Sequence, residues 1–126
     1  MKVPDHLHFT PSHEWVDPSN PDAVSMGISD HAQEELTDVV YLELPEVGRM
    51  VKKGEPIAVI ESVKAANDIF APVGGEIVEV NEALAEAPEP VNQDPYGDGW
   101  MVKIKLADPS EIDGLMNAES YREHLA

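Results

Sequence analysis

Two short stretches of this chain repeat one pattern, in which a glycine and a glutamate precede a run of β-forming residues. The pattern occupies residues 54–61 and again residues 75–82, and both copies end on glutamate. A glycine before such a run is typical of a turn that leads into a strand. Two similar strand units related by an approximate two-fold axis would form a flattened barrel of short antiparallel strands. The repeat therefore predicts a mainly β fold, a flattened antiparallel β barrel or sandwich.

Strand patterns also occur outside the repeat. We expect further strands at residues 14–16, 23–28, 38–44, 69–71 and 100–106, and the first copy of the repeat continues to residue 63. Ser29 or Asp30 should cap a short helix over residues 30–36, since acidic side chains occupy its first turn. The first hundred residues thus predict strands around one short helix.

The final part of the chain has a different pattern. Three prolines and two glycines in and next to residues 85–98 predict a loop. After the last strand, Asp108 and Pro109 form a favourable helix start, with glutamate three residues after the capping aspartate. We therefore expect a helical C-terminus over residues 110–125, broken near Gly114.

Composition limits the class of protein. At 126 residues the chain can bury a modest core, so we predict one domain over residues 1–126. The absence of cysteine excludes disulfides, thiolate metal sites and cysteine nucleophiles, so any sulfur redox chemistry must come from an attached group. A net charge of −17 with only eight basic residues argues against nucleic acid and against anionic membrane surfaces. The same charge favours protein partners with basic rims.

No segment of the sequence has the features of a membrane span or a targeting peptide. No apolar run approaches the length of a transmembrane helix. Residues 1–10 contain neither an apolar core segment nor an arginine-rich amphipathic stretch. We therefore expect a soluble, cytoplasmic monomer.

Lys64 is the only basic residue between Lys53 and Lys103. That interval also contains ten acidic residues: Glu55, Glu61, Asp68, Glu76, Glu79, Glu82, Glu86, Glu89, Asp94 and Asp98. The small side chains of Ser62, Ala65 and Ala66 would let the active site of another protein close over the amine. The position between the two repeats predicts an exposed turn. A lone lysine in such a turn is often only a solvated residue, but this setting favours a lysine that is modified.

Other patterns do not indicate catalysis. His6, His8 and His13 with Glu14 match no standard metal-ligand spacing, so no metal is expected. Gly74 and Gly75 lack the helix start that a phosphate loop requires. The spacings support neither a Ser-His-Asp triad nor a pair of catalytic carboxylates, and we expect a protein that is not an enzyme.

Several longer segments together resemble the H protein of the glycine cleavage system, a family of lipoyl carriers. The matching segments are residues 12–16 (SHEWV), 27–36 (GISDHAQEEL), 40–45 (VYLELP), 61–68 (ESVKAAND), 71–76 (APVGGE), 92–97 (NQDPYG) and 99–105 (GWMVKIK). They run in one order from about Phe9 to Ala126. The chain departs from the family in a longer turn over residues 17–22 and in Asn67, where a smaller residue is expected.

The resemblance implies a fold of the lipoyl/biotinyl-carrier type and the role of a shuttle. It implies lipoic acid bound covalently to Lys64, which takes the aminomethyl group of glycine from a pyridoxal-phosphate decarboxylase, the P protein. The group passes to a folate-dependent aminomethyltransferase, the T protein, and a dihydrolipoamide dehydrogenase, the L protein, reoxidises the carrier with NAD. A lipoyl ligase or an octanoyltransferase would attach the arm. The missing cysteines agree with this, since the prosthetic group supplies both sulfurs.

The resemblance also implies a surface groove in which the loaded arm rests. Ser12, Glu14 and Asp68 match the positions that line this groove in the family. Their carboxylates and hydroxyl would hydrogen-bond the amine of the cargo. Taken without the resemblance, the same residues are better explained as a turn cap, a strand acid and a surface charge.

Two other functions remain open at this point. The chain could be another swinging-arm domain, although biotin-accepting lysines are typically bracketed by methionine, whereas Val63 and Ala65 flank Lys64. Lipoyl domains of 2-oxo acid dehydrogenases usually have an acid directly before the lysine and belong to longer chains. The second possibility is a relay that donates lipoate to other enzymes, and this function requires the same lysine.

Overall fold

The computed structural model describes all residues from 1 to 126 and contains two antiparallel sheets. The larger sheet has seven strands in the order β10-β1-β2-β3-β9-β8-β5, and the smaller has three in the order β4-β6-β7. The strands are β1 (His8–Phe9), β2 (Glu14–Asp17), β3 (Val24–Ile28), β4 (Val39–Glu43), β5 (Met50–Val51), β6 (Pro56–Ser62), β7 (Ala66–Phe70), β8 (Gly75–Val80), β9 (Val102–Leu106) and β10 (Met116–Asn117).

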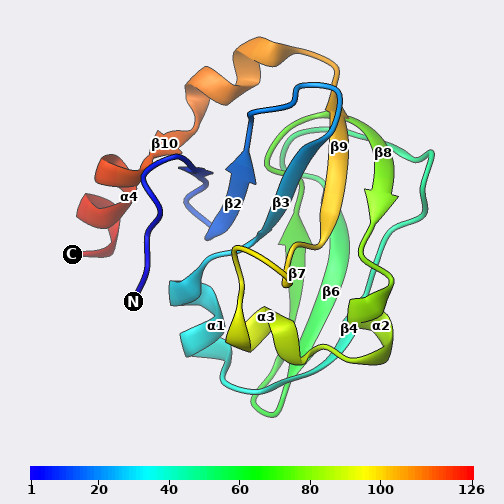
Figure 1. Ribbon diagram of the computed structural model, residues 1–126, viewed down its shortest axis with the longest axis vertical. Coiled ribbons are helices and arrows are strands. Elements are labelled where there is room, and N and C mark those ends of the chain that lie inside the picture. The colour runs from blue at the N-terminus through cyan, green and yellow to red at the C-terminus, as the bar shows by residue number, and fades with distance from the viewer.

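The two sheets form a sandwich with the main apolar core between them (Figure 1). Ile60 of β6, Met26 of β3 and Ile104 of β9 are among its fully buried side chains. Each sheet keeps two edge strands, so the barrel is not closed. The prediction of a mainly β antiparallel fold is confirmed, in its sandwich form.

The two copies of the repeat provide one strand to each sheet. Gly54 precedes β6 of the smaller sheet, and Gly75 begins β8 of the larger sheet. Both glycines have positive φ angles, 86° for Gly54 and 153° for Gly75. The predicted strands are present with small shifts at their ends, whereas the two-residue strands β1, β5 and β10 have no clear sequence pattern.

Helix α1 (Asp30–Leu36) has the bounds that the sequence predicts. The Ser29 hydroxyl caps it by accepting a hydrogen bond of 3.2 Å from the backbone N–H of Ala32. The far end is held by Asn92, whose side-chain amide donates to the Thr37 carbonyl at 2.7 Å and accepts from the Val39 N–H at 2.9 Å. Both ends of α1 are therefore fixed by specific side chains.

Residues 85–98 differ from the expected loop. They include part of α2 (Ala83–Glu86) and all of α3 (Glu89–Gln93). Pro90 lies within the first two positions of α3, where proline needs no intrahelical N–H partner and its fixed φ suits a helix. One of the prolines that suggested a loop therefore helps to begin a helix. Figure 1 shows α3 beside α1, at the end of the molecule where β6 turns into β7.

The C-terminal segment is helical in two parts, as expected. A 3-10 helix spans Pro109–Gly114, and α4 spans Ala118–Leu125. Between them β10 pairs with β1. Tyr121 of α4 packs with Phe9 and Trp15 in a second, smaller core. This second core joins the C-terminal helix to the first strands.

Candidate functional site

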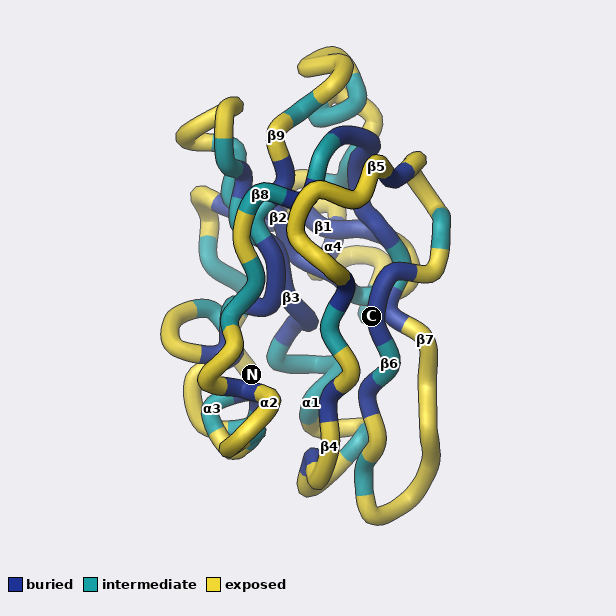
Figure 2. Tube along the Cα trace, turned by 90° about the vertical axis from the view of Figure 1, so that its right-hand side faces the viewer, coloured by how far each residue is buried: buried dark blue, intermediate teal, exposed yellow.

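The turn between β6 and β7 carries Lys64 at its tip. The Ser62 side-chain hydroxyl accepts hydrogen bonds from the backbone N–H groups of Lys64 at 3.1 Å and Ala65 at 3.2 Å. The Ser62 N–H also donates to the Ala65 carbonyl at 2.8 Å. Figure 2 shows this turn as an exposed loop extending from the body of the molecule. A defined turn therefore presents the lysine to solvent.

The Lys64 amine has no carboxylate partner. Its Nζ donates to the Glu35 carbonyl near the end of α1 at 3.1 Å. The four ion pairs of the protein involve other cations. A single hydrogen bond to an exposed carbonyl is readily exchanged for water, so the amine is available for modification.

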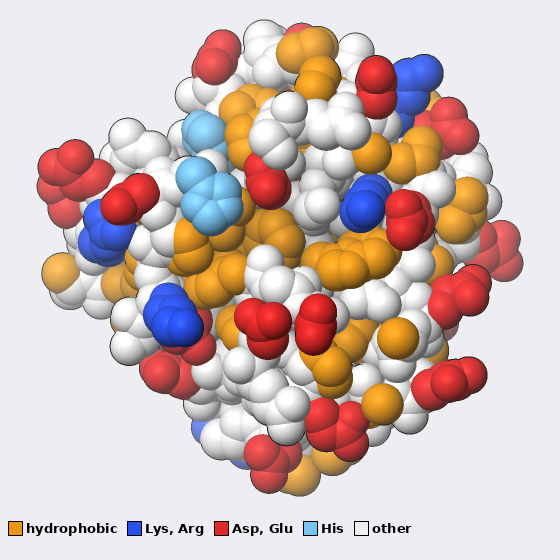
Figure 3. Space-filling view, in the orientation of Figure 1, with side chains coloured by type: hydrophobic (Ala, Val, Ile, Leu, Met, Phe, Trp, Pro, Cys, Tyr) orange, Lys and Arg blue, Asp and Glu red, His pale blue; other side chains and the backbone are white.

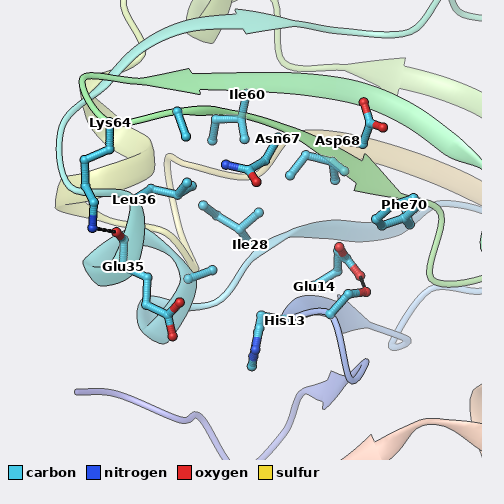
Figure 4. A pocket seen from close by; sticks show the side chains of 14 residues that line it. His13, Glu14, Ile28, Glu35, Leu36, Ile60, Lys64, Asn67, Asp68 and Phe70 are labelled. Carbon is cyan, nitrogen blue, oxygen red and sulfur yellow. Dashed lines mark hydrogen bonds between the residues drawn. The ribbon is translucent and has the colours of Figure 1, made fainter.

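A groove of about 440 Å³ extends from Lys64 between α1 and the smaller sheet. Its lining residues come from the Ser12–Glu14 segment, β3, α1, β6, the turn and β7. Figure 4 shows Lys64 at one end, Glu14 at the other, and Ile28, Leu36 and Ile60 between them. The groove therefore has an apolar middle and a carboxylate at its far end.

Glu14 is only 2 % exposed. Its Oε1 accepts hydrogen bonds from the Thr10 hydroxyl at 2.5 Å and the Ser12 hydroxyl at 2.7 Å. Oε2 takes part in neither of these bonds, and it is not fully buried. Figure 4 shows this second oxygen directed into the groove. The carboxylate is thus held by one oxygen and can accept a hydrogen bond with the other.

The other two residues of the expected groove are placed differently from Glu14. Ser12 is exposed and acts through its hydrogen bond to Glu14. Asp68 lies at the rim, with its carboxylate pointing away from the groove (Figure 4). The strand register explains this, because Asp68 pairs with Val59 whereas Asn67 pairs with Ile60 of the groove, and paired residues share a face. Asn67 is therefore the β7 polar side chain that faces inward.

His13 also lines the groove, next to Glu14. Its backbone has a φ of 74°, which is uncommon for a residue other than glycine. Its Nδ1 lies 2.7 Å from the Tyr121 hydroxyl, and its ring centroid lies 4.7 Å from that of His31. Burial and the neighbouring His31 lower the pKa of His13, against the opposing effect of Glu35. The ring is accordingly neutral at neutral pH.

Comparison with known proteins agrees with this arrangement. The family model described as "Glycine cleavage H-protein" matches residues 7–126. The chain belongs to the glycine cleavage H-protein family. It is therefore a carrier component of the glycine cleavage system, as the resemblance implied.

Relatives match the chain along nearly its full length. A glycine cleavage system H protein of Thermus thermophilus is 57 % identical, covering 99 % of this chain and 97 % of its own. That of Pseudoalteromonas atlantica is 53 % identical, covering 98 % and 95 %. The crystal structure of an H protein from Mycobacterium marinum superposes with a TM-score of 0.89 at 38 % identity, covering 98 % of both chains. Membership of the H-protein family sets aside a biotin carrier and a dehydrogenase lipoyl domain.

Two other kinds of feature are absent from the structure. No group of three or more His, Asp or Glu side chains is arranged to hold a metal ion. None of the helices combines the length and apolar character needed to cross a membrane.

Sequence reasoning identified the two ends of the groove but missed a lining residue and the buried side chain that contacts it. His13 was considered only as a metal ligand, and Tyr121 was not considered at all. The two are 108 residues apart, so no local pattern could have joined them. The sequence signal that could have indicated His13 is the segment over residues 12–15 (SHEW), in which His13 is adjacent to Glu14.

Proposed function

We propose that Lys64 of this H-protein carries one lipoyl group through an amide bond and delivers the aminomethyl group of glycine between enzymes. The observation that carries the proposal is the exposed amine of Lys64 at the tip of a defined turn, without an ion-pair partner and at the mouth of a groove. In this role the chain, one carrier domain over residues 1–126, positions its arm and catalyses no step itself.

The groove fits such an arm. Lipoate attached to lysine is apolar along most of its length, and the middle of the groove is formed by Ile28, Leu36 and Ile60. When bound, lipoate supplies the pair of sulfurs that this cysteine-free chain lacks. The protein would then bind the arm, exclude water from its cargo and orient its end.

Glu14 is the group we propose for the cationic end of the cargo. Its free Oε2 would accept a hydrogen bond from the ammonium, while Ser12 and Thr10 hold Oε1. A charge-assisted bond in a site shielded from water is stronger than an exposed ion pair. We propose that Ser12 orients the carboxylate and that Asp68, at the rim, contributes negative potential to the groove.

The partners follow from the same proposal. We propose that the P protein loads the carrier, the T protein unloads it and the L protein reoxidises it. A lipoyl ligase or an octanoyltransferase would supply the arm. The compartment that we propose for the carrier and these enzymes is the cytoplasm.

The experiment is replacement of the proposed attachment site. Lys64→Arg keeps a cation in the turn but cannot form the amide, so the variant should fold normally and lose all glycine–bicarbonate exchange with the P protein. Lys53→Arg is the matched control, because Lys53 is also exposed and lies outside the main groove. Exchange supported by Lys64→Arg would refute the proposal.

A further inference from the structure

Tyr121 joins the C-terminal helix to the groove without entering it. The side chain is 0 % exposed. Its hydroxyl lies 2.7 Å from His13 Nδ1 and 2.7 Å from the Ser29 hydroxyl. Burial raises the pKa of Tyr121, the hydrogen bond to Ser29 opposes this, and the charges of Glu14 and Glu35 raise it further. The phenol therefore stays protonated and can donate.

The two partners of this hydroxyl belong to the far end of the groove and to the cap of the helix that forms one of its walls. His13 precedes Glu14, whose carboxylate closes the far end. Ser29 caps α1, which places Leu36 in the groove and presents the Glu35 carbonyl to Lys64. The backbone N–H of Ser29 also donates to the His13 carbonyl at 2.9 Å. The far end of the groove and the α1 wall are thus joined by a backbone bond and by one buried side chain.

The distances allow this connection to run from Ser29 to His13. In that direction Ser29 Oγ, which accepts the Ala32 N–H, donates its own hydrogen to the Tyr121 oxygen. Tyr121 then donates to His13 Nδ1, and the neutral ring carries its proton on Nε2. The charged or titratable groups facing His13 are His31 and Glu35 of α1, Tyr121 and His124 of α4, and the adjacent Glu14.

We propose that Tyr121 is a positioning residue for the docked arm. Its hydroxyl holds the His13 ring against α1 and so keeps Glu14 at the distance from α1 that the loaded arm requires. The inference rests on the proposed docking of the arm in this groove. The hydroxyl contributes through one buried hydrogen-bonded chain, so its removal should loosen the far end of the groove and leave the fold intact.

A conservative variant isolates the hydroxyl. Tyr121→Phe keeps the ring, which stacks on Phe9 with centroids 4.3 Å apart and an interplanar angle of 3°. Tyr96→Phe is the matched control, since Tyr96 packs against the same aromatic core. The Tyr96 hydroxyl also bridges two segments, accepting from the Asp30 N–H at 2.9 Å and donating to the Lys2 carbonyl at 2.7 Å. It lines no part of the groove.

The first measurement uses the protein without lipoate. Nitrogen-15 NMR of the His13 ring reports which nitrogen carries the proton. We expect Tyr121→Phe to mix the two neutral tautomers and to shift the Glu14 and Leu36 amide signals, and we expect Tyr96→Phe to leave the His13 ring signals unchanged. An unchanged His13 ring in Tyr121→Phe would overturn the inference, whatever group Lys64 carries.

The second measurement uses lipoylated protein loaded with the aminomethyl group, followed for ammonia release without the T protein. We expect release from Tyr121→Phe to be roughly 2- to 10-fold faster than from wild type, the range that one buried hydrogen bond covers. Tyr96→Phe should match wild type. Glu14→Gln serves as the reference for the proposed docking.

The reference separates two kinds of failure. If Glu14→Gln accelerates release and Tyr121→Phe does not, the positioning role of Tyr121 is wrong and the docking groove stands. If neither variant accelerates release, the docking proposal fails and the inference fails with it. Acceleration by both, with Tyr96→Phe unchanged, supports the role of the Tyr121 hydroxyl.

Discussion

At the scale of single residues, the far end of the groove is formed by a buried carboxylate with only one oxygen engaged in hydrogen bonds. Two hydroxyls, from Thr10 and Ser12, donate to the same Glu14 oxygen. A buried carboxylate is costly unless its remaining lone pairs find donors. The free oxygen is therefore suited to a cation that arrives in the groove.

Replacing Glu14 by Gln removes this charge and preserves the shape of the side chain. We expect Glu14→Gln to fold and to accept lipoate normally, and to release ammonia from the loaded arm roughly 10- to 150-fold faster, since a hydrogen bond to a charged group contributes about 1.5–3 kcal/mol. Asp68→Asn, whose carboxylate points away, should show a smaller effect. Equal release from Glu14→Gln and wild type would assign Glu14 to the scaffold alone.

At the scale of elements, strand β8 begins where only glycine fits. Gly75 has a φ of 153°, and a Cβ placed on it would lie 2.0 Å from the Lys105 carbonyl oxygen of β9. Gly54 has a φ of 86°, but no atom lies within 4 Å of its Cβ position. The two glycines of the repeat thus differ in how tightly they are packed.

This difference predicts unequal destabilisation. Gly75→Ala should lower the free energy of unfolding by on the order of 3 kcal/mol. The new methyl group would strain the backbone of β8, and it would also force β9 to move away. Gly54→Ala should lower the free energy of unfolding by about 1 kcal/mol through backbone strain alone. Urea denaturation monitored by tryptophan fluorescence measures both values. If both variants lose a similar free energy of unfolding, β9 moves away from the new methyl group without an energetic cost.

Elements were predictable from sequence where a local pattern determined them. The Ser29 cap located α1, and the position of Lys64 between the two repeats located the exposed turn that carries it. Pro90 misled, because proline can begin a helix as well as prevent one. The inward side of β7 required the register between β6 and β7, which decides that Asn67 and not Asp68 faces the groove. The link from Tyr121 to the groove needed the folded chain, since its partners are far away in sequence.

At the scale of the whole molecule, charge governs how partners approach. The chain has 25 acidic and 8 basic side chains. On the face shown in Figure 3, acidic side chains surround a more apolar centre. Such a surface attracts proteins with basic rims and repels acidic ones over distances that salt shortens.

We therefore expect the apparent affinity for the proposed P and T proteins to weaken as salt rises. The effect should lie mainly in the association rate, since long-range attraction steers encounters. Stopped-flow binding at increasing sodium chloride measures this rate. Rates that do not change with salt would show that the charge serves only solubility.

The central claim is that Lys64, and no other lysine, carries lipoate. Intact-mass spectrometry of the protein isolated from its native host, followed by peptide mapping, tests it most directly. We expect one added lipoyl group on the peptide that contains Lys64, and no addition to Lys64→Arg expressed in the same host. A chain that is unmodified, biotinylated or lipoylated at another lysine would contradict it.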